Sequence, residues 1–292
     1  MKTKNIIFIL TCALASCSPS GGGQSKPVPA TAISATSTPI PNPATLATQA
    51  LIPTSTLSST YIIPPNGSWQ IQYTGDINTN LNVEVYNLDL FDTDPAVSAD
   101  LHVRGIFVMC YFSAGSYENW RPDVNAFPAA ILGLGLEGWE GERWLDIRRV
   151  DLLAPIMEAR LDLAAEKGCH GVDPDNVNGY TNETGFPLTY EDQLNYNIWL
   201  AESAHSRGLS IGLKNDIEQI PDLLPYFDWQ LNEECFSYDE CELLLPFIEA
   251  GKPVFQIEYE LQTSEFCERA IQLGFQSIRK NWKLDEFIEA CP

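Results

Sequence analysis

The strongest constraint on the fold is a set of eight short apolar runs, each rich in residues that favour β-strands. They are Trp69–Tyr73, Asn82–Leu88, Ile106–Phe112, Gly171–Asp173, Ser210–Leu213, Phe227–Leu231, Pro253–Tyr259 and Gln276–Arg279. Stretches with helical spacing lie between most of them. Strands and helices that alternate until eight strands have formed are typical of a parallel barrel. The sequence therefore predicts an α/β fold, a single TIM-like (β/α)8 barrel, with a doubly wound open sheet as the alternative.

Two of the helical stretches carry signals of their own. In the first, apolar side chains between Leu152 and Ala164 recur on one face. The second opens at Thr189, where Asp192 three residues later completes a sequence close to a capping box, and it stops near Gly208. Both stretches are predicted to be helices.

One long stretch, from Gly115 to Arg149, fits the alternation poorly. It contains Trp120, Trp139 and Trp144 among glycines and prolines. It is predicted to be an elaborated loop at the mouth of the barrel. The alternative is a packed surface excursion in which the tryptophans are structural.

The start of the chain has the features of an export signal. Met1–Lys4 is basic, Ile6–Leu14 is apolar but too short to span a bilayer, and small residues precede Cys17. Because Leu-Ala-Ser-Cys resembles the bacterial lipobox, residues 1–16 are predicted to be a lipoprotein signal peptide and Cys17 the lipidated residue. The protein is then expected at the bacterial cell surface or in the periplasm, held to the membrane only by this anchor. An ordinary secretory signal is the alternative.

The segment that follows, residues 17–65, consists mostly of Ser, Thr, Pro, Ala and Gly, with Lys26 as its only charged residue. Such a segment cannot bury enough apolar surface to offset the entropy lost on ordering, so it is predicted to be a disordered tether. Residues 66–292 then form the barrel domain, which has a length common for this fold.

The charge balance is strongly acidic. With 17 Lys and Arg against 39 Asp and Glu, the formal net charge is −22. A nucleic-acid partner is excluded, because it requires clustered positive charge. Such a charge would attract a cationic ligand, or it serves only to keep an exported surface soluble.

Polar residues follow the apolar runs, and in a barrel the carboxyl ends of the strands form one rim where active sites are built. In chain order these residues are Asp89, Ser113, Glu118, Asp173, Asp175, Lys214, Asn215, Asp216, Glu233, Glu234, Glu258, Tyr259 and Lys280. Glycoside cleavage requires two such carboxylates, one to protonate the leaving oxygen and one to act as nucleophile or to activate water. Asp175 and Glu233 are the candidates, although Asp-Pro-Asp-Asn is also a sequence that turns prefer.

Other chemistries find little support. The chain has three histidines, His102, His170 and His205, and neither an HExxH motif nor a GxSxG elbow. A zinc hydrolase, a metal-dependent deacetylase and a serine triad are therefore disfavoured, and neither a metal nor a cofactor is expected.

Several short motifs together resemble glycoside hydrolase family 114, the endo-α-1,4-polygalactosaminidases. They are Trp69–Gly75, Tyr86–Phe91, Cys110–Glu118, Gly171–Asn178, Gly212–Asn215 and Asn232–Cys235. The resemblance spans the domain and implies a TIM-like barrel that hydrolyses a galactosamine-containing exopolysaccharide internally, with Asp175 and Glu233 in the positions of the family carboxylates. The chain departs from several relatives at Asp173, where they carry Glu, and at Asn178, where they often carry Asp. At Glu234 many relatives carry Gln.

The resemblance also implies a set of substrate contacts. A deacetylated polygalactosamine is cationic, so carboxylates are expected to bind its ammonium groups and tyrosines to stack on its rings. The predicted contacts are Asp89, Glu118, Asp173 and Glu258, then Tyr73, Tyr111 and Tyr259, together with Asn176, Lys214 and Asn215 of the matched motifs. The enzyme is expected to act as a monomer. The alternative function is that of a non-catalytic carbohydrate-binding lipoprotein.

Apart from Cys12 and Cys17, six cysteines remain, an even number that suggests disulfides in an exported domain. We favour Cys235 with Cys241 and Cys267 with Cys291. Cys110 and Cys169 are expected on neighbouring strands, as a bridge or as two buried thiols. A metal site is less favoured because no CxxC spacing occurs.

Overall fold

The computed structural model describes residues 61–292, and their core is a nine-stranded sheet. The signal peptide expected at 1–16, the lipidated Cys17 and residues 17–60 of the expected tether lie outside the described residues. The strands, in sheet order, are β1 (Trp69–Gln72), β2 (Val85–Asp89), β3 (Phe107–Ser113), β7 (Gly171–Asp175), β8 (Ser210–Lys214), β9 (Trp229–Glu233), β10 (Val254–Glu258), β11 (Gln276–Arg279) and β12 (Glu289–Ala290). The first eight are parallel and correspond to the eight apolar runs, and β12 is antiparallel to β11. The expected α/β barrel order is confirmed.

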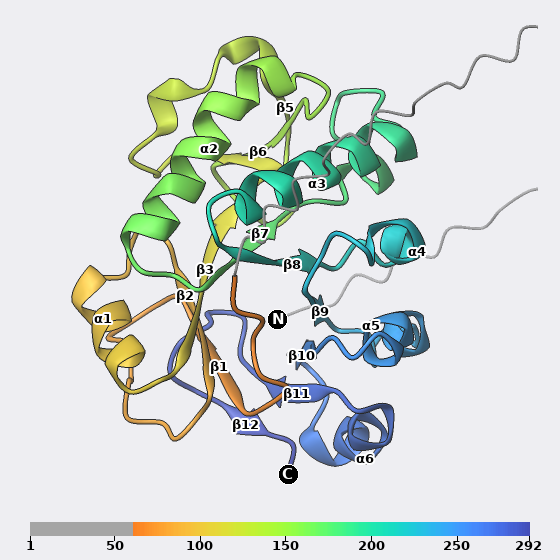
Figure 1. The fold of residues 1–292 in the computed structure, drawn as a ribbon. Helices are drawn as coiled ribbons and strands as arrows, with labels where there is room; N and C mark the ends of the chain where they lie inside the picture. The colour runs from red at the N-terminus through yellow and green to blue at the C-terminus, as the bar shows by residue number, and fades with distance from the viewer. Residues whose placement is uncertain (1–60) are drawn as a thin grey trace, which may run out of the picture. The chain divides into compact units, whose positions relative to one another are not determined.

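The parallel strands curl around a common centre, and helices lie on the outside (Figure 1). The helices are α1 (Pro95–Val103), α2 (Val150–Glu166), α3 (Tyr190–His205), α4 (Ile220–Leu223), α5 (Leu245–Glu249) and α6 (Thr263–Leu273). Within residues 61–292, β1 at one edge of the sheet and β11, the last of the parallel strands, are joined through side chains rather than by a backbone ladder. The Trp69 indole donates to the Gln276 carbonyl (2.8 Å), and Lys280 donates to the Gln70 side chain (2.9 Å). The barrel therefore has one seam that side chains close.

Both predicted helices form as expected. The Thr189 hydroxyl accepts from the Asp192 backbone amide, and the Asp192 carboxylate accepts from the Thr189 amide, so α3 begins with a complete capping box. Two of the four unpaired amides at a helix start are thereby satisfied. In α2 the buried residues lie on the face predicted from their spacing, with Leu153, Met157 and Leu161 fully enclosed.

Alternate residues of each strand point into the barrel. The inward residues near the start of the strands are apolar, and those at the carboxyl ends are polar. The lower, buried cluster includes Val85 of β2, Phe107 of β3 and Trp229 of β9. Gly171 and Gly212 make room for Trp229, since a Cβ at either position would lie 2.5 Å or less from its ring. Met109 of β3 and Leu231 of β9 belong to the same cluster, and the inward positions after them carry the polar residues Tyr111 and Glu233.

The poorly fitting stretch after β3 is folded as a small sheet of its own. It contains β4 (Ser116–Glu118), β5 (Leu132–Gly135) and β6 (Glu142–Leu145), paired antiparallel in the order β4-β6-β5. Two short 3-10 turns lie in this stretch, η1 (Val124–Ala126) and η2 (Ala129–Ile131). Three more follow later strands of the barrel: η3 (Gly179–Thr181), η4 (Ile217–Gln219) and η5 (Cys241–Leu244). Gly115 is required where this excursion begins, because a Cβ there would lie 1.7 Å from the Asn176 carbonyl oxygen.

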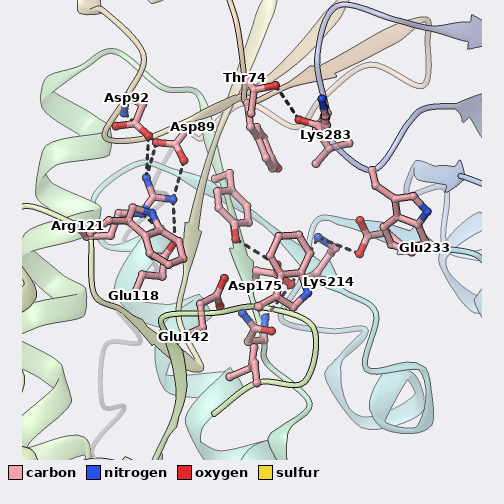
Figure 2. A pocket seen from close by; sticks show the side chains of 18 of the residues that line it. Thr74, Asp89, Asp92, Glu118, Arg121, Glu142, Asp175, Lys214, Glu233 and Lys283 are labelled. Carbon is pink, nitrogen blue, oxygen red and sulfur yellow. Dashed lines mark hydrogen bonds and ion pairs between the residues drawn. The ribbon is translucent and has the colours of Figure 1, made fainter.

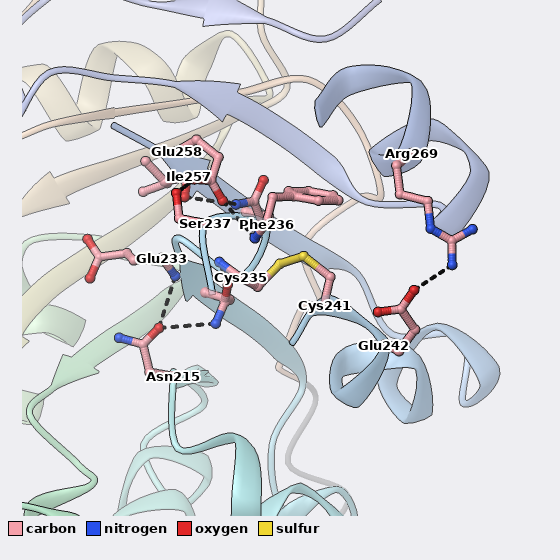
Figure 3. The surroundings of a disulfide bond; sticks show 12 residues. Asn215, Glu233, Cys235, Phe236, Ser237, Cys241, Glu242, Ile257, Glu258 and Arg269 are labelled. Carbon is pink, nitrogen blue, oxygen red and sulfur yellow. Dashed lines mark hydrogen bonds and ion pairs between the residues drawn. A yellow bond between two sulfur atoms is a disulfide. The ribbon is translucent and has the colours of Figure 1, made fainter. Parts of the chain in front are cut away.

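Three disulfides fix the outer parts of the domain, and they join the pairs that the cysteine positions suggested. Their members are Cys110 with Cys169, Cys235 with Cys241, and Cys267 with Cys291. The second lies beside the carboxyl end of β9 (Figure 3). Disulfides are typical of exported proteins.

The chain is ordered against the barrel before residue 66. Tyr61, which the composition placed in the tether, stacks on His205 of α3 with ring centroids 4.2 Å apart. Among residues 61–292, no helix combines the length and the apolar content that crossing a membrane requires.

Candidate active site

Two carboxylates and a lysine meet where three neighbouring strands end. Asp175 is the last residue of β7, Lys214 of β8 and Glu233 of β9. The Lys214 ammonium lies 3.5 Å from an oxygen of Asp175 and 3.5 Å from an oxygen of Glu233, so these oxygens are at most twice that distance apart. Figure 2 shows Lys214 between the two acids. The charge of one buried cation is therefore shared by two partly exposed carboxylates.

The period of the strands explains why these three residues converge. Asp175, Lys214 and Glu233 lie an even number of residues from Gly171, Gly212 and Trp229, which face the barrel interior. The same parity brings Tyr111 of β3 inward, and its hydroxyl donates to Asp175 (3.3 Å). A side chain one residue further along would point at the helices instead.

Each of these strands is followed by a residue with a left-handed backbone. The φ angles are +61° at Asn176, +50° at Asn215 and +64° at Glu234. Asparagine tolerates this region, whereas a glutamate there is strained. The turn at Asn215 lets its side-chain oxygen accept from the Glu233 backbone amide (2.9 Å), and the turn at Asn176 lets its amide donate to Asp175 (2.8 Å). These turns thus fix the carboxylate of Asp175 and the backbone of Glu233.

Three predicted tyrosines are hydrogen-bond donors at the rim. Tyr259 donates to Glu233 through a short bond, and Tyr73 donates to Asp173 (3.2 Å). Burial, reinforced by the neighbouring carboxylates, raises the pKa of Tyr73, Tyr111 and Tyr259 well above 10. Their hydroxyls therefore remain protonated throughout the range in which an enzyme works, and they orient the acids at least as much as they offer a ring face.

Asp173 lies beneath the cleft rather than in its lining. It is fully buried, and one of its oxygens accepts from Asn87 (2.8 Å) and Tyr73. Burial raises its pKa, and the positive charge of Lys214 opposes that rise. The structure thus places this predicted substrate contact as support for the residues above it.

Asp89 and Glu118 line the cleft, but their charges are already matched within the protein. Arg121 donates to both oxygens of Asp89 (2.9 and 2.7 Å) and to Glu118 (2.8 Å), and all three side chains are buried. Burial raises the pKa of Glu118 to about 7, although Arg121 and Arg160 lower it. Asp92 at the solvent edge completes the cluster, 3.3 Å from Arg121.

Glu258 points away from the cleft because it has the opposite parity from Tyr259. Its carboxylate accepts from the Phe236 amide (2.9 Å), the Ser237 hydroxyl (2.7 Å) and the Gln256 amide (2.8 Å), as Figure 3 illustrates for the turn after β9. It holds the segment that includes the Cys235–Cys241 disulfide. Of the predicted contacts, it is the one that the structure places on the far side of its strand.

A cleft of about 370 Å³ lies over the carboxylate pair. Its walls include residues that the sequence did not single out as contacts: Trp120, Arg121, Leu136, Trp139, Glu142, Trp282 and Lys283. Trp120, Trp139 and Trp282 are about half exposed, at 49%, 54% and 52%. Trp144, by contrast, is buried. The excursion after β3 therefore forms one wall of the cleft, as its tryptophans suggested.

In the part of the chain that the structure describes, no three His, Cys, Asp or Glu side chains form a group suited to a metal ion. The side chains around the cleft are mainly carboxylates, tyrosines and tryptophans, with Lys214 at the centre. Such a set of residues is suited to sugar binding and acid–base chemistry.

Comparison with known proteins identifies the family. The model of glycoside hydrolase family GH114 matches residues 52–292. The chain belongs to this family. It is a glycoside hydrolase with the barrel fold that the strand order predicted.

Two solved structures and one further sequence resemble this GH114 domain. The crystal structure of Aspergillus fumigatus Ega3 in complex with galactosamine is 41% identical, covers 78% of this chain and 97% of Ega3, and has a TM-score of 0.75. The glycoside hydrolase domain of PelA from Pseudomonas aeruginosa shares the fold, with 14% identity, 76% and 98% coverage and a TM-score of 0.61. An uncharacterised protein of Deinococcus radiodurans is 28% identical over 259 residues, 75% of this chain and 82% of that protein.

Proposed function

We propose that this enzyme hydrolyses a galactosamine-containing polysaccharide at internal bonds, with Asp175 and Glu233 as its catalytic pair. The observation that carries the proposal is the placement of these two carboxylates on adjacent strand ends, under one cleft and on either side of Lys214. The sugar is inferred from Ega3, which was crystallised with galactosamine and shares 41% of its aligned residues with this chain.

In this mechanism Asp175 is the nucleophile and Glu233 the general acid. The Asp175 carboxylate attacks the anomeric carbon while protonated Glu233 gives its proton to the leaving oxygen, and a glycosyl ester forms. Glu233 then takes a proton from water, which attacks the ester and releases Asp175. Both carboxylates regain their starting protonation states at the end of the cycle.

The neighbouring groups fit these roles. The Lys214 ammonium lies beside both acids and stabilises the negative charge that returns to each in turn. The Tyr259 hydroxyl donates to Glu233, and the backbone amide of Asn176 donates to Asp175. These hydrogen bonds fix the orientation of both carboxylates. Trp120, Trp139 and Trp282 offer apolar faces on which sugar rings stack.

We further propose that the enzyme is exported and anchored through Cys17. The three disulfides support an oxidising compartment, and the acidic charge of the chain is suited to a cationic polymer outside the cell. Labelling of the expressed protein with a radioactive fatty acid, with Cys17→Ser as the comparison, tests the anchor. Equal labelling of both proteins would refute it.

Hydrolysis is tested with the purified protein and a partly deacetylated α-1,4-galactosamine polymer, beside chitosan and polygalacturonate. Release of oligomers from the first polymer is expected, and Asp175→Asn and Glu233→Gln should each lower kcat by about 10³-fold or more. Glu166→Gln, an exposed change at the end of α2, is the matched control. Binding without hydrolysis of any polymer would favour a non-catalytic carbohydrate-binding lipoprotein.

A further inference from the structure

A second hollow opens on the other side of Glu233. Its volume is about 360 Å³, and it shares Asn178, Asn215 and Glu233 with the main cleft. We call it the acidic arm and define it by the residues that it does not share with the main cleft and that carry carboxylates or rings: Asp216, Glu218, Glu234, Glu240, Tyr180 and Tyr238. Because the two hollows meet at a catalytic carboxylate, a polymer in the cleft would extend into this arm.

Asp216 is the most unusual residue of the acidic arm. It is 3% exposed, and its backbone is left-handed with φ +42°. One carboxylate oxygen accepts from the Asn197 side chain (2.9 Å), while the other has no hydrogen-bond partner among the described residues. A buried, unpartnered carboxylate oxygen is costly unless something outside the protein satisfies it.

Within the described chain, no positive charge in the acidic arm compensates the Asp216 carboxylate. No lysine or arginine of residues 61–292 lines the acidic arm, whereas the main cleft contains Arg121, Lys214 and Lys283. Burial raises the pKa of Asp216 to about 8; the Asn197 amide and the Tyr180 hydroxyl lower it, and the charge of Glu218 adds to the rise. Tyr180 itself donates to Glu218 (3.1 Å). The arm therefore lacks the positive charge that its acids require.

The missing charge does not correspond to a metal ion. A divalent cation requires several carboxylates converging on one point, and the described chain contains no such group of three. Carboxylates spread along a hollow with two tyrosine rings are better matched to a chain of amino sugars, in which single ammonium groups recur at the spacing of the sugar units.

We propose that the acidic arm is a subsite that selects free amino groups, with Asp216 as the residue that binds the ammonium of a sugar next to the cleaved bond. This inference rests on the proposed function and adds to it a preference for deacetylated units on one side of the cleavage point. An N-acetylated unit presents a neutral amide, which leaves the carboxylates of the arm uncompensated. Discrimination between the two sugars then comes mainly from desolvated charge rather than from shape.

Binding to an inactive enzyme isolates this subsite from catalysis. In the Asp175→Asn background, calorimetry is carried out with an α-1,4-galactosamine oligomer and with its fully N-acetylated form. The deacetylated oligomer should bind at least about tenfold more tightly. Adding Asp216→Asn should remove most of that preference while changing affinity for the acetylated oligomer less than about twofold. Asparagine keeps the acceptor for Asn197 and tolerates the left-handed backbone.

The outcomes separate this inference from the proposed function. A preference that survives both Asp216→Asn and the double change Asp216→Asn with Glu218→Gln would overturn the inference, even if the wild-type enzyme cleaves the polymer. Stoichiometric binding of Ca²⁺ alone that Asp216→Asn abolishes would overturn it in favour of a metal site. If the wild-type enzyme cleaves no polymer, hydrolysis fails as the function, yet loss of the binding preference in Asp216→Asn still supports the subsite. Glu166→Gln serves again as the control and should leave both affinities unchanged.

Discussion

The two sides of the cleft handle buried acids in opposite ways. On the side of β2, β3 and β4, Asp89 and Glu118 are buried around Arg121, which donates to both. We call this cluster, together with Asp92, the braced arm. In the acidic arm, Asp216 is just as buried but has no cation of residues 61–292 beside it, and the neutral Asn197 amide and Tyr180 hydroxyl are the groups that favour its charged form. A carboxylate with its own cation is part of the scaffold, whereas one without a cation remains available for a ligand.

Lys214 stands at the boundary between the two arms. It has the buried position of a scaffold cation, yet its partners Asp175 and Glu233 are about one quarter exposed, at 23% and 25%. Its ammonium therefore matches the acids in the resting enzyme without sealing them from substrate. The comparison of the arms leads to three predictions. The first removes the cation of the braced arm, the second removes the buried carboxylate of the acidic arm, and the third changes an aromatic residue of the cleft without changing any charge.

The largest effect is expected for Arg121→Met, which keeps most of the side-chain volume but removes the cation. Asp89 and Glu118 would then be buried without a partner, and breaking a buried ion pair in this way costs about 3–5 kcal/mol of unfolding free energy. Urea unfolding at neutral pH measures the loss. Because the acids can be protonated as the pH falls, the loss should be smaller near pH 5.

The control for this prediction is Arg269→Met. Arg269 also pairs with an acid, Glu242, but both side chains are about half exposed, so the change should lower the unfolding free energy far less than Arg121→Met does. If Arg121→Met were as mild as Arg269→Met, the acids of the braced arm would have to be stabilised by something other than Arg121, and the contrast between the arms would disappear.

An intermediate effect of opposite sign is expected for Asp216→Asn without ligand. The pKa of this carboxyl is raised from its usual value near 3.8 to about 8, so the folded protein is most stable where the group is protonated in both states. Stability is then lost as the pH rises from about 4 to about 8. Since asparagine does not titrate, Asp216→Asn should be more stable than the wild type at pH 8 by about 2–4 kcal/mol, with little difference at pH 4.

Thermal unfolding across that pH range measures the difference. Glu218→Gln is the comparison within the same arm, because Glu218 is exposed and its removal only relieves Asp216 of a neighbouring charge. Asp216→Asn must flatten the pH profile more than Glu218→Gln does. If the stability of Asp216→Asn and that of the wild type changed with pH in the same way, burial of the ionised Asp216 carboxylate would not destabilise the folded protein.

The eight strands and the central carboxylates could be predicted because they depend on local pattern. Apolar runs mark strands, and the residue at each strand end falls on the rim. Strand parity also separates Tyr259, which faces the cleft, from Glu258, which faces outward. Counting in steps of two from the apolar inward positions is sufficient to exclude Glu258 as a substrate contact, because it falls on the outward face of its strand.

The partners of those carboxylates could not be predicted in the same way. Arg121 comes from an irregular segment, and its partner Asp89 is 32 residues earlier in the chain. Spacing carries no information about such a contact. The acidic arm was equally hidden, since Asp216 follows Lys214 in the sequence but turns away from it through two successive left-handed residues, Asn215 and Asp216.

The smallest effect is expected where neither charge is touched. Trp139 forms part of the cleft on the side of the braced arm and is 54% exposed, so Trp139→Ala should change the unfolding free energy by less than about 0.5 kcal/mol. Loss of a ring that stacks on sugar should weaken oligomer binding by roughly fivefold, about 1 kcal/mol. Leu243→Ala, an exposed apolar change in η5 outside both arms, is the control.

The salt dependence of oligomer binding then distinguishes the arms. The loss of affinity in Trp139→Ala should be the same at about 0.05 and about 0.5 M NaCl, whereas the loss of affinity in Asp216→Asn should become smaller at the higher salt concentration. Equal salt dependence for both would show that charge and stacking are not divided between the two sides of the cleft.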